Sequence, residues 1–385
     1  MDKTSVDVIV IGGGISGICA AIAAAKNQAS VALIESKEAI GGNAIHSNVG
    51  TICGAYYYAE ENDFKAIQHP FLLQFLEGMK AKPFDYHQGL VVIPYQIKSL
   101  SNYLYDLLEI HGVTLYSNCE VNHVQLSEDQ ITSIECNWKG EALCLEGKAF
   151  VDCSGRAVIS DLAGLEMLKS EQYQMASQVF RIKDIHSENE FSVNFAIQKA
   201  ITTQSKKVRH VSLIPGSLQN GQADLKLTLP VTITDETDRE ALNQTGRKLS
   251  IDTFDLLKRK VPSIHSAELD FIYPEAGIRI QQRSKGKYVL TKKDVLEGKK
   301  WAEERKIIGT WPIEDWKDAK RVSLSFIANH DYYEIPLDCL QSTNCKNLFF
   351  GGKNISATDE AIASARVIGT CIQSGYEAGR LAARI

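Results

Sequence analysis

The segment VDVIVIGGGISG, residues 6–17, constrains the fold of this chain more than any other stretch. Residues 8–11 form an apolar run of the kind buried on both faces of a parallel sheet, and three glycines with GxGxxG spacing follow directly. In that pattern Gly12 permits a tight turn, Gly14 lets the backbone approach a pyrophosphate, and Gly17 lets the next helix pack closely on the strand. The segment therefore predicts a strand, a turn and a helix whose amino-terminal amides bind a dinucleotide.

The next residues continue this pattern. Residues 15–27 are rich in alanine and isoleucine and predict a buried helix, and residues 30–34 predict a second strand. Glu35 stands eighteen positions after the last glycine, where an acidic residue accepts hydrogen bonds from a ribose. A glycine turn in an ordinary βαβ unit is the alternative. The expected contacts of the dinucleotide from this region are Gly12, Gly14, Ile15, Ser16, Gly17, Glu35 and Ser36.

Composition excludes several classes of protein. The 385 residues carry a formal net charge of −5, which argues against a protein that follows nucleic-acid phosphates with a basic face. Apolar segments stay below the eighteen residues that span a bilayer, and the first strand leaves no room for a signal peptide, so we expect a cytoplasmic protein without membrane insertion. The nine cysteines are odd in number and never at CxxC spacing, which argues against a metal site or a disulfide redox pair.

The middle of the chain predicts two further groups of elements. A helix is predicted over residues 94–111, and residues 56–92, which lack a clear period, are a candidate lid. Short β-rich runs predict one more strand for the main sheet and a small antiparallel meander. These runs are residues 113–116, 120–126, 131–138 and 142–150.

Beyond about residue 170 the composition changes. Strands are predicted at residues 192–196, 210–214 and 226–233, and a helix over residues 235–261. We interpret this part as a substrate-binding domain of mixed α and β structure, inserted between two parts of the dinucleotide-binding domain. The predicted domains are residues 1–170 and 331–385 for dinucleotide binding and residues 171–330 for the substrate.

A second pair of glycines, Gly41 and Gly42, opens the sequence GGNA after Glu35. This stretch resembles the segment that passes beneath the flavin in FAD-binding proteins of the glutathione-reductase type, and in particular that of fumarate-reductase-like flavoproteins. Residues 151–155, VDCSG, resemble the strand end that closes the sheet beneath the adenosine of FAD in such proteins, although a turn without a ligand is the alternative there. The resemblance implies FAD rather than NAD as the cofactor.

Four carboxy-terminal segments resemble a family of FAD-dependent oxidoreductases. They are GIR at residues 277–279, G-x-Y-x-L-x-x-x-D at 286–294, Y-x-I-P at 333–336 and NL-x-x-GG-x-x-ISA at 347–357. The resemblance implies an α/β fold, in which a Rossmann-like FAD-binding domain has a central parallel sheet and a small antiparallel meander, with an inserted α+β substrate domain. Many flavoproteins place Gly-Asp where this chain has Gly-Lys-Asn, and the asparagine is expected to take over the hydrogen bonds. The further residues expected at FAD are Gly41, Gly42, Asn43, Val121, Ser154, Gly155, Gly352 and Asn354.

Four side chains are candidates for the chemistry. His46, just past the double glycine, is a candidate general base, and His330, before the Y-x-I-P turn, is a candidate wall of the active site. Arg279 is a candidate for bidentate binding of a substrate carboxylate. Arg366, in the early turns of a helix expected over residues 361–383, would stabilise charge on the reduced flavin or bind a carboxylate. Packing or a structural ion pair is the alternative for each.

A second GxGxxG after a strand is missing from the sequence, which argues against a dedicated NAD(P)H domain. We therefore expect an FAD-dependent dehydrogenase or oxidase that takes a hydride at flavin N5 from a small organic substrate, such as an amine or alcohol bearing a carboxylate. Two alternatives remain open. One is a flavin monooxygenase or reductase that uses NAD(P)H, and the other is a flavin-binding redox sensor without catalysis.

Overall fold

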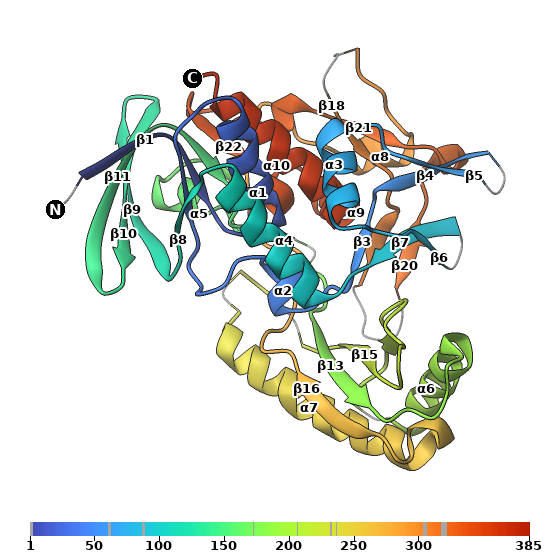
Figure 1. The fold of residues 1–385 in the computed structure, drawn as a ribbon. Helices are drawn as coiled ribbons and strands as arrows, with labels where there is room; N and C mark the ends of the chain where they lie inside the picture. The colour runs from blue at the N-terminus through green and yellow to red at the C-terminus, as the bar shows by residue number, and fades with distance from the viewer. Residues whose placement is uncertain are drawn as a thin grey trace.

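A seven-stranded sheet forms the centre of the larger of two bodies in the computed structural model (Figure 1). The structure describes residues 3–60, 63–86, 89–171, 173–205, 207–231, 233–235, 237–302, 306–316 and 322–385. The sheet has the order β8-β2-β1-β11-β10-β9, and β22 also pairs with β11. Its strands are β1 (Lys3–Ile11), β2 (Val31–Ile34), β8 (Thr114–Tyr116), β9 (Cys119–Ser127), β10 (Gln130–Trp138), β11 (Glu141–Asp152) and β22 (Leu348–Phe350).

The pairing of these strands confirms the predicted fold class. The strand β1 is parallel to both β2 and β11, and β22 is parallel to β11. By contrast, β9, β10 and the first half of β11 form an antiparallel meander at one end of the same sheet. Because parallel strands place their carboxyl ends at one edge, the glycines after β1 and the acid after β2 lie side by side.

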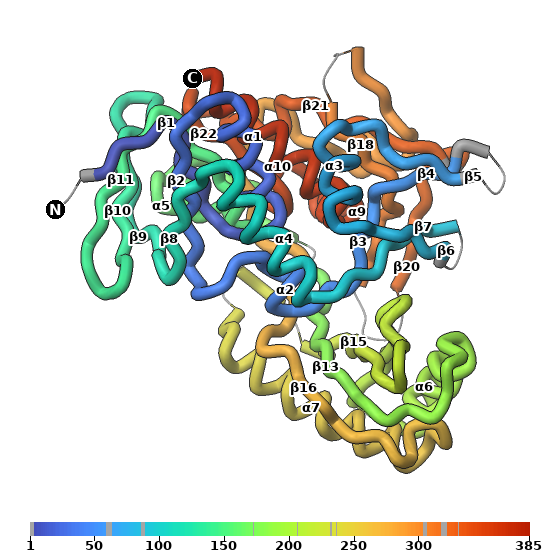
Figure 2. Tube along the Cα trace, viewed as in Figure 1, coloured from blue at the N-terminus to red at the C-terminus, as the bar shows by residue number. Residues whose placement is uncertain are grey.

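Two helices far apart in the sequence cover one face of the sheet. Helix α1 (Ile15–Lys26) packs against α10 (Ile368–Ala382), as Figure 2 shows for the blue and red tubes, and α4 (Ile97–Ile110) lies next to α1. A Cβ at Gly375 or Gly379 would overlap backbone atoms of α1, so both glycines are needed for this close approach.

The single helix predicted over residues 361–383 is in fact two helices. Helix α9 (Asp359–Ala365) ends at Arg366, and Val367 is extended, with φ −70° and ψ 155°, before α10 begins. Neither proline nor glycine occupies the break, so the sequence carries no local signal for it. The cause is tertiary: Gly369 lies directly against the backbone of Gly54, which determines where α10 starts.

The smaller body contains a four-stranded antiparallel sheet with the order β14-β15-β13-β16 and its own hydrophobic core. Its strands are β13 (Ser177–Lys183), β14 (Val211–Leu213), β15 (Ala223–Thr228) and β16 (Glu268–Ile272), and its helices are α6 (Glu190–Gln204) and α7 (Arg239–Lys260). The predicted strand at residues 192–196 is wrong, because these residues lie in α6. Val193, Ile197 and Ile201 are buried at helical spacing, and Asn189 caps the helix.

The segment after residue 280 packs with the larger body, so the smaller body is narrower than the predicted range 171–330. Arg283 is buried there and donates to the Ala357 carbonyl and to the Asp359 carboxylate, which joins this segment to the start of α9. The elements of this segment are β17 (Arg283–Ser284), α8 (Lys292–Leu296), β18 (Lys306–Gly309), β19 (Ile313–Asp315), β20 (Ser323–Ser325) and β21 (Tyr333–Pro336).

The remaining elements also belong to the larger body. Helix α3 (Pro70–Gly78) buries Phe71, Leu72 and Phe75 in the hydrophobic core of the larger body. This helix lies within residues 56–92, the range predicted as a candidate lid. The helices and strands described here are α2 (Asn43–His46), β3 (Thr51–Cys53), β4 (Tyr56–Glu60), β5 (Asp63–Ala66), α3 (Pro70–Gly78), β6 (Phe84–Tyr86), β7 (Leu90–Pro94), α5 (Val158–Leu162) and β12 (Met167–Leu168). Across the described residues, every helix is too short or too polar to cross a lipid bilayer.

Candidate functional site

Two glycine loops lie side by side at the carboxyl ends of β1 and β2. The Gly41 amide donates to the Gly13 carbonyl at 2.7 Å, and a Cβ at Gly42 would come within 3.1 Å of the Gly14 Cα. Gly12 has φ +97°, and a Cβ there would meet the Cys153 carbonyl oxygen at 2.7 Å. The backbone of this cradle, rather than its side chains, therefore shapes the site.

Helix α1 begins at the cradle with its first amides available to an anion. Its N-cap, Gly14, provides no side chain to cap the helix. A Cβ at Gly17 would overlap the Gly12 carbonyl oxygen, whereas a Cβ at Gly14 would have Gly42 Cα as its nearest described neighbour, at 3.9 Å. The space beside Gly14 is therefore open toward the amino end of α1, where a phosphate group is stabilised by free amides and by the helix dipole.

Glu35 completes the cradle from the end of β2. Its carboxylate is buried and accepts hydrogen bonds from the Gly13 amide at 2.7 Å, the Lys37 amide at 2.9 Å and the Ser36 hydroxyl at 3.2 Å. A carboxylate has about four acceptor positions, so it retains capacity for a ribose hydroxyl. The open space at Gly14, the uncapped helix and this carboxylate fit the diphosphate and ribose of FAD, with Gly12 to Gly17 and Glu35 as the residues that would hold them.

A second group of segments closes around the same region. The Asn43 side-chain amide donates to the Ile278 carbonyl at 3.0 Å, and the Lys353 ammonium donates to the same carbonyl at 3.2 Å. Burial and the neighbouring Arg239 lower the pKa of Lys353 to about 7. A Cβ at Gly155 would lie 2.8 Å from the Lys353 Cε, so the predicted cofactor glycine leaves room for this lysine. The loops predicted to surround FAD thus meet at the GIR segment.

Other residues predicted at the cofactor have structural contacts. Ser154 donates to the Asp152 carboxylate from its amide and its hydroxyl, at 2.9 and 2.6 Å, which shapes the turn after β11. Asn354, fully buried, donates to the Asp152 carbonyl at 3.1 Å and accepts from the Ser284 amide at 2.9 Å. Val121 lies in the core beneath the meander. Their roles toward FAD stay predictions.

Arg279 and Arg366, predicted from distant parts of the chain, come together around Glu314 of β19. Arg366 donates to the Glu314 carboxylate at 3.1 Å and to the Gln174 side chain at 3.3 Å. The Arg279 guanidinium lies 4.6 Å from the centre of the Trp316 ring and donates to the Met175 carbonyl. The Trp316 indole donates to Glu314 at 3.3 Å, so one carboxylate and one ring organise both guanidinium groups.

Arg279, Glu314, Trp316 and Arg366 form a cluster in which charge and burial shift pKa values. Arg366, the Trp311 indole and Arg279 hold the pKa of Glu314 below its usual value, in spite of desolvation, which acts in the other direction. Burial and the nearby Arg366 lower the pKa of Arg279 to about 9. Arg279 and Glu314 are therefore charged at neutral pH.

Like Glu314 and Trp316, two further residues near Arg279 were not predicted from the sequence. Lys226 of β15 donates to the Val49 carbonyl at 3.0 Å, and desolvation together with Arg279 lowers its pKa to about 8. His210 packs its ring edge-on against Trp316 at 5.3 Å, and its pKa is lowered to about 4 by burial and by Arg279. A signal existed for Lys226, because DLKLT places two charged residues on one face of an apolar strand.

The two histidines predicted as catalytic are placed differently. His46, in α2, makes a 2.9 Å hydrogen bond to the Ala39 carbonyl of its own loop. Within the described part of the chain, His46 makes no hydrogen bond or ring contact with Arg279, Arg366 or Trp316. The His330 side chain lies outside the described residues. Both roles stay predictions.

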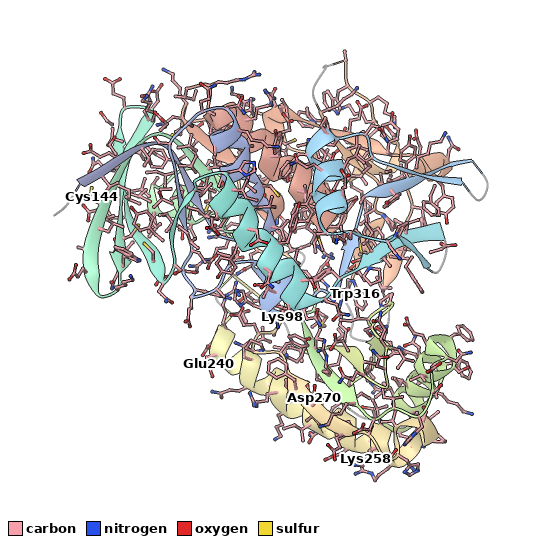
Figure 3. The ribbon with its side chains drawn as sticks, in the orientation of Figure 1. Lys98, Cys144, Glu240, Lys258, Asp270 and Trp316 are labelled. Carbon is pink, nitrogen blue, oxygen red and sulfur yellow. The ribbon has the colours of Figure 1, made fainter. Side chains whose placement is uncertain are left out.

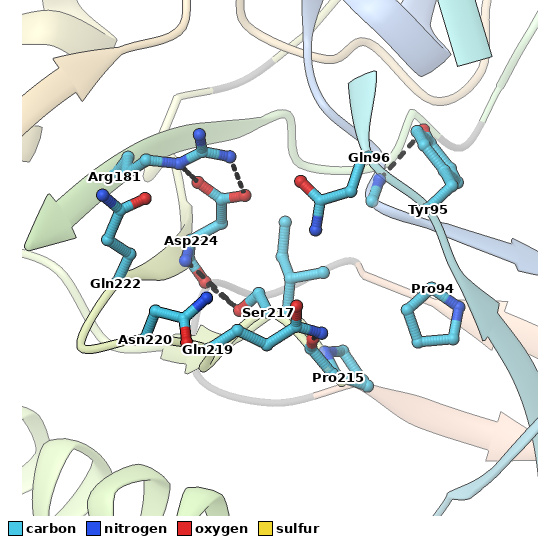
Figure 4. A pocket seen from close by; sticks show the side chains of 13 residues that line it. Pro94, Tyr95, Gln96, Arg181, Pro215, Ser217, Gln219, Asn220, Gln222 and Asp224 are labelled. Carbon is cyan, nitrogen blue, oxygen red and sulfur yellow. Dashed lines mark hydrogen bonds and ion pairs between the residues drawn. The ribbon is translucent and has the colours of Figure 1, made fainter. Parts of the chain in front are cut away.

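The cluster lies where the two bodies meet, as Figure 3 shows for the labelled Trp316. Beside it a cavity of about 270 Å³ opens between the smaller body and the segment after β7 (Figure 4). The cavity is lined by Tyr95 and Gln96 on one side and by the Arg181–Asp224 ion pair, 2.8 Å, on the other. Asp224 and Lys226 stand two residues apart on β15 and therefore share one face of the strand.

The sequence pattern of the family described as FAD dependent oxidoreductase matches residues 7–385. The chain belongs to this family. The cofactor of the protein is accordingly FAD. That the cradle at Gly12 to Gly17 with Glu35 binds it stays a prediction, which the open space at Gly14 and the uncapped start of α1 favour. Curated proteins gave no match to the sequence.

Solved structures with a similar fold include an enzyme named as flavin-dependent and an enzyme named as a hydroxylase. The flavin-dependent brominase Bmp2 has a TM-score of 0.54 and 14% identity, over 99% of this chain and 79% of its own. The OxyS anhydrotetracycline hydroxylase from Streptomyces rimosus has a TM-score of 0.50 and 11% identity, over 98% of this chain and 62% of its own. At such identities the likeness extends to the fold of this FAD-dependent oxidoreductase and no further.

Proposed function

We propose that this FAD-dependent oxidoreductase oxidises a small organic acid, an amine or alcohol that carries a carboxylate, bound between the two bodies. The observation that carries the proposal is the pair Arg279 and Arg366, which Trp316 and Glu314 hold together at the boundary. FAD supplies the acceptor for the two electrons that the substrate loses.

In this proposal Arg279 binds the substrate carboxylate. Its hydrogen bond to the Met175 carbonyl uses one Nη group, so the guanidinium retains donors for a bidentate contact. Trp316 covers one face of the guanidinium and excludes water there. Glu314 holds Arg366 in place and keeps this second charge near the substrate.

Two other functions are weighed against this one. A flavin monooxygenase or reductase would take its electrons from NAD(P)H, and the names of the brominase and hydroxylase of similar fold make this alternative worth testing. A flavin-binding redox sensor would hold FAD in the same cradle without turnover.

The test is an anaerobic titration of the purified protein with FAD bound, followed by the flavin absorption band. The donors are amino acids and hydroxy acids, each paired with its uncharged primary amide, for example lactate with lactamide, and then NADH and NADPH. We expect at least one acid to bleach the flavin and its amide to bleach it more than tenfold less effectively.

The outcomes separate the three functions. Bleaching by NAD(P)H alone would contradict the proposal and support the monooxygenase or reductase. Bleaching by no donor, with FAD fully bound, would support the sensor. Equal bleaching by an acid and its amide would contradict the carboxylate site.

A further inference from the structure

The cluster between the two bodies contains more positive than negative charge. Lys226, Arg279 and Arg366 contribute three cations, whereas Glu314 is the one carboxylate among the groups that shift the pKa of Arg279 and of Lys226. His210 is neutral at pH 7, since its pKa is lowered to about 4. The described groups therefore leave two positive charges uncompensated in a half-buried site, a situation that proteins avoid unless an anion binds there.

Contacts through Trp316, Glu314 and His210 connect the segments that carry the three cations. Trp316 contacts Arg279 through its face, His210 through its ring edge and Glu314 through its indole nitrogen. His210 precedes β14, which pairs with β15 so that Ser212 lies opposite Lys226. Lys226 reaches from the smaller body to the Val49 carbonyl of the larger body, at 3.0 Å, and so lies across the boundary next to the same ring.

The cations also retain hydrogen-bond donors. The Arg366 Nε is buried, and among the described residues it has no hydrogen-bond partner. The hydrogen bond of Lys226 within the described chain goes to Val49, which uses one of the three N–H groups of an ammonium. The unpartnered Nε of Arg366 and the two further N–H groups of Lys226 can bind a ligand that accepts hydrogen bonds with negatively charged oxygens.

We infer that the substrate carries two negative charges, one bound by Arg279 with Arg366 and the other bound by Lys226. This inference rests on the proposed function and extends it from an organic acid to a dianion. Two kinds of molecule have two such anionic groups. One is a dicarboxylic acid, and the other is a carboxylic acid with a phosphate monoester, whose phosphate alone carries about −1.5 to −2 at pH 7. The neighbouring cavity, which shares the face of β15 with Lys226, gives room for the uncharged remainder.

The test measures binding rather than turnover, through the change that an added acid causes in the absorption spectrum of bound FAD. The probes are the dicarboxylates from malonate to adipate, phosphoglycolate, and matched monoanions, namely the monoamides of the dicarboxylates and glycolate. The proteins are wild type, Lys226→Met, Lys226→Arg and Arg279→Ala, with Lys183→Met of the same sheet as control. Thermal unfolding and flavin content are measured for each variant.

For wild type we expect one dianion to bind at least tenfold more tightly than its matched monoanion. Lys226→Met should abolish this preference and leave monoanion binding within about twofold, while Lys226→Arg should restore most of it. Tight binding by dicarboxylates alone, or by phosphoglycolate alone, identifies which dianion the site takes.

Two failures are distinguishable. If monoanions bind through Arg279 but dianions gain nothing and Lys226→Met has no effect, the dianion inference is wrong and the proposed function stands. If Arg279→Ala leaves all acids bound as in wild type, the proposed function fails as well. Should Lys226→Met lose flavin or unfold early, the Lys226→Arg variant and the wild-type preference still decide the inference.

Discussion

The FAD cradle and the cationic cluster are built in opposite ways. The cradle uses backbone: its glycines at 12, 14, 17, 41 and 42 exist because side chains there would meet other parts of the chain or the space of the cofactor. The cluster uses side chains: Lys226, Arg279, Glu314 and Arg366 come from four separate segments and interact through charge. The cradle should therefore fail through steric changes and the cluster through charge changes.

The largest expected effect of a steric change is at Gly17. In Gly17→Val the side chain would overlap the Gly12 carbonyl oxygen, so α1 must move away from β1. We expect the purified protein to contain no FAD, at least a hundredfold weaker FAD binding by fluorescence titration, and a lower melting temperature. Full flavin content in this variant would contradict the close packing of strand and helix.

The largest expected effect of a charge change is at Glu314. In Glu314→Gln, Arg366 and Arg279 lose their carboxylate, and the new side-chain NH2 group faces N–H donors that both oxygens of Glu314 accept from. We therefore expect a loss of about 3 kcal/mol in the free energy of unfolding. Chemical denaturation measures it, and Glu297→Gln, on the surface, is the control. Stability equal to that of the control would show that the cluster does not need its negative charge.

The Gly14→Ala variant separates an effect on FAD binding from an effect on the free energy of unfolding. In Gly14→Ala the new Cβ meets no described atom closer than 3.9 Å, and φ is −71°, so the free energy of unfolding of the apoprotein should change by less than about 0.5 kcal/mol. FAD binding should nevertheless weaken about tenfold, because the methyl group occupies the path of the diphosphate. Unchanged FAD affinity would place the diphosphate elsewhere.

The smallest expected effect is a pH dependence of dianion binding. Lys226 has a pKa of about 8 and faces Arg279, Arg366, Glu314 and Cys53. A bound dianion raises that pKa, so affinity should be constant below pH 8 and fall as the pH rises through 8. The affinity for the dianion is measured from the flavin spectrum at pH values from about 6.5 to about 8.5, a range below the pKa of Arg279, which is about 9. In Lys226→Met the fall should be absent, and a fall of the same size in that variant would assign it to another group.

The same contrast explains what could be predicted from the sequence. The glycine spacing, the apolar strand and the acid after β2 are local, and backbone geometry dictates them, so the sheet and the cofactor were predictable. The cluster is formed by tertiary contacts: Glu314 and Trp316 follow no recognisable spacing, and the pattern DLKLT marks Lys226 without showing what it contacts. The break between α9 and α10 was likewise decided by packing that no short window of sequence contains. The helix that contains residues 192–196 was predictable, because Asn189 caps it and its buried apolar residues have helical spacing.

The most direct measurement is the flavin spectrum of the Arg279→Ala variant as organic acids are added, with Arg259→Ala on the surface of α7 as control. Since Arg279 belongs to the cluster and not to the cradle, we predict full FAD content in both variants. The acid-induced spectral change should persist in the control and weaken at least tenfold in Arg279→Ala. An unchanged response to acids in Arg279→Ala would contradict the account.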